Sequence, residues 1–242
     1  MSGHSKWNNI KRKKGASDAA KAKVFTKVAR EMSVAVKEGG ADPDTNGKLR
    51  DCIAKAKAAN MPNDNIKRVL EKAASAGSGE SYESITYEGY GPGGVAVIVE
   101  TMTDNRNRTA GSVRHHFDKY GGNLGANGCV SWSFDKKGVL VIDNEDGDLD
   151  EDTVMMDAMD CGADDFEPEE DCFTVYTTPD DFNAVADALT AKGYSFVSAQ
   201  IEMVPQNYVK LSPEDADKME KMLDLFDDDD DVQNTWHNWD QE

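Results

Sequence analysis

The sequence predicts an α+β protein of several domains, in which an N-terminal three-helix bundle precedes two ferredoxin-like α+β domains, one inserted in the other. Three observations predict this class. Apolar residues recur at helical spacing before a Gly/Ser-rich linker, β-branched residues dominate after it, and residues 138–204 read as a complete β-α-β-β-α-β series. We therefore expect domains at 1–78, at 79–134 together with 206–242, and at 135–205.

The first domain is predicted to contain three short amphipathic helices. An apolar stripe over residues 25–36 indicates the first helix, and Gly39-Gly40 ends it because glycine tolerates a left-handed backbone. A second helix is expected from about Thr45 and a third after Pro62, which suits a first helical turn. None is long enough to be stable alone, so packing between the helices must hold the bundle.

The remainder of the chain alternates between strand and helix patterns. The turn at Gly89–Gly94 lacks the ending of a phosphate-binding loop and leads to a strand, which favours a structural hairpin. In order, we expect strands at 84–90 and 95–103, a helix at 109–120, a strand pair at 130–134 and 139–142, a helix at 152–161, strands at 164–166 and 172–176, a helix at 182–191, a strand at 195–204, a helix at 213–225 and a strand near 232–237.

Charge is unevenly distributed along the chain. Residues 1–75 hold 17 Lys and Arg against 8 Asp and Glu, a net charge of +9, whereas the remaining 167 residues carry −28. Such asymmetry indicates a nucleic-acid-binding module joined to an acidic body. The acidic body should repel phosphates and so restrain indiscriminate binding by the basic part.

The strongest candidate for a nucleic-acid contact is a basic cluster at the N-terminus. Its cations could neutralise phosphates with release of counterions, and its tryptophan could stack on a base or pack on the bundle. A solvated basic tail is the alternative, but the charge continues onto a helix, which favours nucleic acid. The candidate residues are Lys6, Trp7, Lys11, Arg12, Lys13, Lys14, Lys21, Lys23, Lys27 and Arg30.

A second candidate contact lies between a predicted strand and a predicted helix. Amide and guanidinium donors there could hold a phosphate or an acidic partner, and a capped helix with surface arginines is the equally favoured alternative. The residues are Asn105, Arg106, Arg108 and Arg114. Neither cluster distinguishes DNA from RNA, because both polymers present phosphates.

Other features favour no catalytic or metal chemistry. The four cysteines form no CxxC pair, which predicts reduced, partly buried thiols rather than a zinc site. We find no nucleophile elbow and no HExxH motif, and we expect no cofactor, no small-molecule substrate and no enzyme activity. The aspartate run at 227–231 is interpreted as a solvated loop. Without a signal peptide or an apolar run of membrane length, a cytoplasmic protein with no membrane partner is expected.

Several long motifs, in order along the whole chain, resemble the YebC/PmpR family. They are Ser2-Gly-His-Ser-Lys-Trp7, the Lys-Arg-Lys-Lys block, Asn60-Met-Pro62 with Asp64-Asn-Ile66, Tyr87-Glu-Gly-Tyr-Gly-Pro-Gly-Gly94, Thr103-Asp-Asn-Arg-Asn-Arg-Thr109 and Asp230-Asp-Val-Gln-Asn234. That family includes the mitochondrial translational activator of cytochrome c oxidase subunit I. The chain departs from the family in its lengthened aspartate run and its strongly acidic inserted domain.

The resemblance implies a helical bundle with two α+β domains and a cytoplasmic transcriptional regulator that binds DNA. Other members are similar to ribosome-associated translation factors that relieve stalling, notably at proline runs. We therefore keep two hypotheses, a DNA-binding regulator and a factor that binds ribosomal RNA or the ribosome, with an RNA-acting enzyme as a third. The charge asymmetry is compatible with a monomer.

Overall fold

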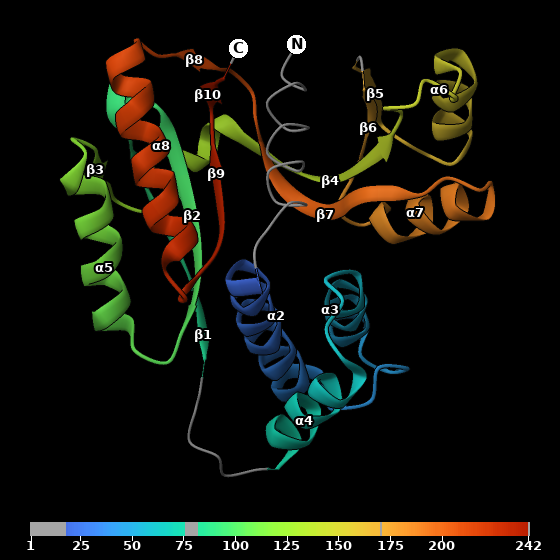
Figure 1. Cartoon of the computed structure of the whole chain (residues 1–242), viewed down its shortest axis with the longest axis horizontal. Coiled ribbons are helices and arrows are strands. Elements are labelled where there is room, and N and C mark those ends of the chain that lie inside the picture. The colour runs from blue at the N-terminus through green and yellow to red at the C-terminus, as the bar shows by residue number, and fades with distance from the viewer. Residues whose placement is uncertain (1–17, 76–81, 170, 242) are drawn as a thin grey trace. The chain divides into compact units, whose positions relative to one another are not determined.

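The computed structural model describes residues 18–75, 82–169 and 171–241 (Figure 1). The chain divides into two compact units. One comprises Ser131–Leu211 with the residues from Asn238 onward, and the other runs up to Val130 and resumes at Ser212–His237. Among the described residues, no helix has both the length and the apolar character needed to span a bilayer. The three expected domain ranges remain predictions.

The second unit begins with the predicted helical bundle, formed by α2 (Asp18–Gly39), α3 (Gly47–Ala58) and α4 (Asn63–Ala74). Its core is a single apolar cluster that includes Met32 and Leu49, both fully buried. The second helix begins two residues later than expected, because Asn46 caps it. The Asn46 side chain accepts a hydrogen bond from the Leu49 amide at 3.1 Å and donates to the Ala35 carbonyl at 2.7 Å, so it joins α3 to α2.

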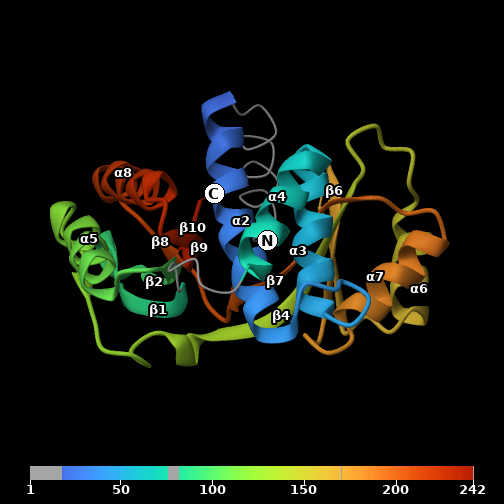
Figure 2. The same cartoon turned by 90° about the horizontal axis from the view of Figure 1, so that it is seen from below.

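The same unit contains a four-stranded antiparallel sheet whose strands come from both sides of the insertion. The strand order is β3-β1-β2-β9, with β1 at Glu83–Tyr90, β2 at Ala96–Thr103, β3 at Asn123–Leu124 and β9 at Val232–His237. A short 3₁₀ turn, η1 (Pro92–Gly94), joins β1 to β2. Helices α5 (Arg106–Lys119) and α8 (Pro213–Asp228) pack together beside the sheet (Figure 2), where the Phe117 and Phe226 rings meet edge to face, 5.2 Å apart.

The inserted unit has the ferredoxin-like order that the sequence predicts. Its elements are β4 (Phe134–Asp143), α6 (Glu151–Asp160), β5 (Asp165–Pro168), β6 (Cys172–Thr177), α7 (Phe182–Ala191) and β7 (Phe196–Pro205). The strands form an antiparallel sheet of order β5-β6-β4-β7. A buried cluster that includes Leu140, Val154 and Leu189 joins α6 and α7 to it. Short strands β8 (Val209–Lys210) and β10 (Trp239–Asp240) pair in parallel. The α+β class is therefore confirmed.

The expected strand pair at 130–134 and 139–142 is wrong. A 3₁₀ turn, η2 (Ser131–Ser133), leads into the single long strand β4, and Gly138 lies inside that strand opposite Thr177. A Cβ atom at position 138 would collide with Oγ1 of Thr177 and lie 2.7 Å from Cδ2 of Phe182. The glycine is therefore required by packing against β6 and α7, and not by a turn.

Candidate nucleic-acid interface

Most of the expected N-terminal contact cannot be placed. Lys6, Trp7, Lys11, Arg12, Lys13 and Lys14 lie outside the described residues, and Lys21 lies on α2 where its side chain is not described. Three of the expected cations remain, namely Lys23, Lys27 and Arg30, all on α2 and all half-buried. Their surroundings decide whether they can reach a phosphate.

Lys23 and Arg30 are engaged by carboxylates near the end of α8. The Lys23 ammonium pairs with Asp228, which raises the pKa of the lysine. One guanidinium nitrogen of Arg30 donates to Oδ1 of Asp231 at 2.8 Å and to the Met102 carbonyl at 3.2 Å. These contacts hold α2 against the sheet. Arg30 therefore has a structural role and is not part of a solvated basic face.

Asp231 is the centre of this cluster, and its side chain is only 7% exposed. Oδ2 accepts hydrogen bonds from the Thr109 hydroxyl at 2.8 Å and from Nη2 of Arg108 at 2.8 Å. Burial opposes ionisation of this carboxyl, but the hydrogen bonds from Arg108, Thr109 and Arg30 outweigh it and lower the pKa of Asp231. The carboxylate is thus buried, charged and fully engaged.

The interpretation of residues 227–231 as a solvated loop is therefore wrong at both ends, because Asp227 and Asp228 belong to the last turn of α8 and Asp231 is buried. Asp227, Asp228 and Asp230 are exposed, as expected, but Asp231 is buried just before β9. Asp229 is also largely shielded, and its Oδ2 lies 3.1 Å from Nε2 of His116. The run looks uniform in the sequence because the arginines that distinguish Asp231 lie far away along the chain.

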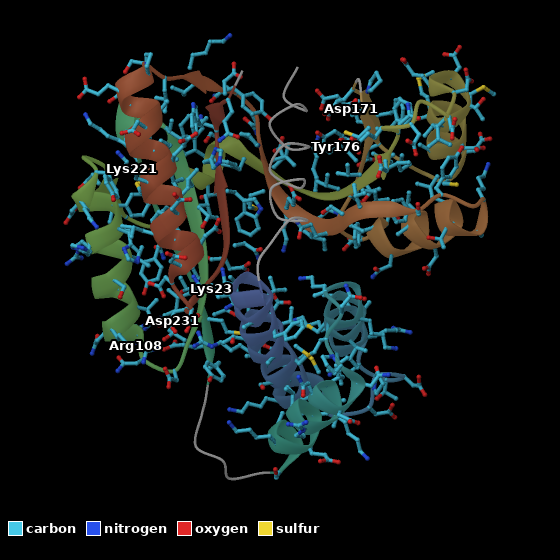
Figure 3. The ribbon with its side chains drawn as sticks, in the orientation of Figure 1. Lys23, Arg108, Asp171, Tyr176, Lys221 and Asp231 are labelled. Carbon is cyan, nitrogen blue, oxygen red and sulfur yellow. The ribbon has the colours of Figure 1, made fainter. Side chains whose placement is uncertain are left out.

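The helix that contains the second expected contact, α5, begins three residues earlier than predicted. Asn105 caps α5 by accepting from the Arg108 amide at 3.1 Å, so the segment read as a loop is the first turn of α5. The Arg108 guanidinium is turned toward Asp231 (Figure 3) and also contacts Asp104 at 2.8 Å. Asn105 and Arg108 thus serve the fold of this unit. Arg106, 67% exposed, forms an ion pair with Glu83 at 3.7 Å, and Arg114 is exposed on the same helix.

A hollow of about 530 Å³ opens beside this cluster and does not favour phosphate. Its rim includes the cations Arg30 and Arg108, but both are already neutralised by aspartates. Five aspartates line the same hollow: Asp104, Asp228, Asp229, Asp230 and Asp231. Carboxylates therefore outnumber arginines, and a polyanion would be repelled there.

The bundle carries two exposed cations on α3, Arg50 and Lys57, that were not among the candidates from the sequence; we call them the α3 ridge. Arg50 and Lys57 are exposed on α3, seven residues apart and so on one face of the helix. The small residues Gly47 and Ala54 lie on the same face, and the Arg50 guanidinium lies over Gly47, where an added Cβ would be 3.7 Å from its Nη2 atom. Neither side chain forms an ion pair with a residue that the structure describes. The seven-residue spacing of these two cations could have indicated a basic face on this helix, but the helix was predicted from the spacing of its apolar residues alone.

The thiols and carboxylates of the described segments show no metal-binding arrangement. Within those segments, no three His, Cys, Asp or Glu residues lie close enough to hold an ion together. All four cysteines are free, with Cys52 and Cys172 buried. Burial, helped by Glu31, raises the pKa of the Cys52 thiol to about 11, so this sulfur is a packing group at neutral pH.

The fold and charge pattern define a class of protein in which a basic helical bundle is joined to two α+β domains rich in carboxylates. The chain belongs to the TACO1/YebC family: the family's N-terminal domain matches residues 5–76, and its second and third domains match residues 82–239. The resemblance drawn from the sequence motifs is thereby confirmed.

Known relatives cover essentially the whole chain. A Clostridium novyi protein is 57% identical over 238 residues, which is 98% of this chain and 96% of the relative. A Caldicellulosiruptor saccharolyticus protein is 57% identical over 242 residues, covering all of both chains. Both are named probable transcriptional regulatory proteins. The crystal structure of a conserved hypothetical protein from Aquifex aeolicus superposes with a TM-score of 0.83 at 42% identity, covering 92% of this chain and 91% of that one.

Proposed function

We propose that this chain is a non-enzymatic cytoplasmic regulator of gene expression that binds DNA through its basic N-terminal third. The division of charge carries the proposal: residues 1–75 have a net charge of +9, while residues 135–205 hold 20 Asp and Glu against three Lys. Phosphate contacts from such a basic module supply sequence-independent affinity. The names of the two bacterial relatives agree with a role in transcription.

Within the described part of the basic third, Arg50 and Lys57 are our candidates for phosphate contacts. They are exposed on one face of α3, whereas Lys23 and Arg30 are held by aspartates of their own unit. Together with the basic block at residues 11–14, the α3 ridge would give the protein two sets of phosphate contacts. Neither set reads bases, so specificity must come from elsewhere.

The decisive experiment measures duplex DNA binding against salt for the full chain and for a variant with residues 11–14 changed to Ala. Loss of four phosphate contacts should lower the slope of log K against log salt by about 3–4. Arg50→Ala with Lys57→Ala should lower it by about 2. The matched control is Lys218→Ala with Lys221→Ala on α8, which removes the same charge from lysines already paired with Glu214 and Asp217. Unchanged DNA affinity after neutralising residues 11–14 would contradict the proposal.

A factor that binds ribosomal RNA is the second candidate, and the exposed arginines of α5 favour it. Arg114 and Arg106, whose exposed ion pair with Glu83 is long at 3.7 Å, give a basic surface outside the bundle, so contacts could form on two surfaces at once, as a large RNA allows. Sedimentation of a lysate through sucrose, with and without DNase, separates the candidates. Migration with ribosomal particles after DNase treatment supports the ribosome, and DNase-sensitive migration supports DNA. In the first case, Arg106→Ala with Arg114→Ala should weaken ribosome binding.

A further inference from the structure

Helix α6 of the inserted unit exposes three methionines. Met155 is 39% exposed, Met156 65% and Met159 42%, whereas Val154 and Ala158 of the same helix are buried against the sheet. A surface helix normally places polar residues on its solvent side. Exposed single apolar residues are common, but three on one short helix form a contiguous patch.

Helical geometry makes the methionines one stripe. Met155 and Met159 lie one turn apart, and Met156 and Met159 are three residues apart, so all three occupy adjacent positions on the helix surface. Met156 lies about 180° around the helix axis from the midpoint between Val154 and Ala158, from the spacing of about 100° per residue. Met155 and Met159 lie about 80° and 120° from that midpoint, so the stripe runs from the flank of α6 to the side opposite the core of its own unit. Helix α6 lies beside α7 in this unit (Figure 2).

Carboxylates surround this methionine stripe. Glu151, Asp152 and Asp160 are exposed on α6, and the domain around them is strongly acidic. Asp157 differs, because it turns toward α7 and binds the Lys192 ammonium and, at 2.7 Å, the Tyr194 hydroxyl. The structure thus neutralises the carboxylate on the α7 side and leaves those next to the methionines available.

We propose that the α6 methionine stripe and its carboxylates bind a basic, amphipathic helical segment of a partner protein. Unbranched, polarizable methionines adapt to differently shaped apolar side chains, which suits them to a helix whose leucines or aromatics lie along one face. Lys and Arg beside those apolar residues would pair with Glu151, Asp152 and Asp160. The domain's charge steers such a cation toward the stripe and repels nucleic acid, which separates this surface from the proposed DNA contact.

The test uses the full chain and a fluorescent Leu/Lys peptide with leucines at i, i+3, i+4 and i+7, followed by anisotropy. Met156→Glu with Met159→Glu should weaken binding about tenfold, or 1.4 kcal/mol. Asn183→Glu with Ala184→Glu on the exposed face of α7 adds the same two charges away from the stripe. That control should bind the cationic peptide as tightly as the parent or more tightly. Asp152→Asn with Asp160→Asn should weaken binding and flatten its salt dependence.

The two explanations predict opposite changes in peptide affinity for the variant with glutamates at 156 and 159. If attraction were only electrostatic, the added glutamates at 156 and 159 would tighten binding, and polylysine would bind as well as the Leu/Lys peptide; either result overturns the proposal. A peptide of residues 1–17 is the third probe. If it binds this surface more tightly than the Leu/Lys peptide, and the methionine variant loses that binding, the occupant is the N-terminal segment of this chain and not a partner. None of these readouts depends on DNA binding.

Discussion

Arg108 and Asp231, 123 positions apart in the sequence, form a two-point ion pair in which Nε donates at 3.2 Å and Nη2 at 2.8 Å to the same carboxylate. The arginine comes from the first turn of α5 and the aspartate from the segment between α8 and β9. Arg30 of α2 reaches the other oxygen of that carboxylate. One buried side chain therefore joins elements from three separate parts of the chain.

Removing this carboxylate should destabilise the protein. Asp231→Ala leaves the Arg108 and Arg30 guanidinium groups and the Thr109 hydroxyl without their shared acceptor. We expect a loss of about 3 kcal/mol in the free energy of unfolding, near the lower end for a broken buried pair because Arg108 is half exposed. Urea denaturation measures it. Asp227→Ala, an exposed change in the same run, should stay within about 0.5 kcal/mol of the parent; equal losses in both would contradict a central role for Asp231.

The same carboxylate should contribute to acid sensitivity. The folded-state pKa of Asp231 is lowered below its unfolded value, so its contribution is complete above about pH 4 and is lost as pH falls through the folded pKa. Thermal melting of the parent and of Asp231→Asn between pH 7 and pH 2 tests this. The stability difference between the two should shrink as pH falls below about 4. A difference that stays constant would show that folding does not shift the pKa of the Asp231 carboxyl.

Substitutions at Arg30 and at the α3 ridge should have different effects, one on stability and the other on DNA affinity. Arg30→Ala removes an ion pair to Asp231 and a bond to the Met102 carbonyl, so we expect a lower urea midpoint. Because that guanidinium is already neutralised, the folded variant should keep the parent salt slope for DNA. Arg50→Ala with Lys57→Ala should show the reverse pattern. If Arg30→Ala lowers the slope by about 1, Arg30 contacts phosphate directly.

Two glycines should respond oppositely to substitution by alanine. Gly138→Ala places a methyl group against Thr177 and Phe182, and overpacking of this kind costs about 1–3 kcal/mol. At Gly111, on the exposed face of α5, an added Cβ meets nothing within 4 Å. Gly111→Ala should therefore stabilise the helix by about 0.5–1 kcal/mol. Calorimetry of both variants checks the signs, and stabilisation by Gly138→Ala would show that β4 can move aside.

Cysteine alkylation should follow burial. Cys52 is buried and its pKa is raised to about 11, while Cys161 at the end of α6 is only half-buried. At pH 8, iodoacetamide should modify Cys161 well before Cys52, as followed by peptide mass spectrometry. In urea the two rates should converge, which controls for intrinsic differences. Equal rates in the native protein would mean that the bundle opens readily around α3.

Local patterns predicted most elements but failed where distant partners decide. The bounds of α7 and β9 match those expected, because apolar spacing and flanking residues mark both. Gly138 fell between two expected strands, because nothing nearby in the sequence indicates that Phe182 and Thr177 are its neighbours. Asp231 looked like its four neighbours for the same reason. Arg30 and Arg108 were expected to contact nucleic acid or a partner, and the sequence could not show that an aspartate of the same chain binds both guanidinium groups.

Because the strands of one sheet come from distant parts of the chain, the two sheets cannot be completed at the same time during translation. β1, β2 and α5 leave the ribosome long before α8 and β9, whereas the strands of the inserted sheet are contiguous in the chain. At about 5–20 residues per second, the 123 positions between Arg108 and Asp231 correspond to ~6–25 s. During that interval the inserted unit can complete its sheet. Val97, Val99 and Phe117 stay exposed until β9 and α8 have been synthesised and can cover them. A nascent chain paused in this window exposes an unfinished apolar surface, which is where a chaperone would act.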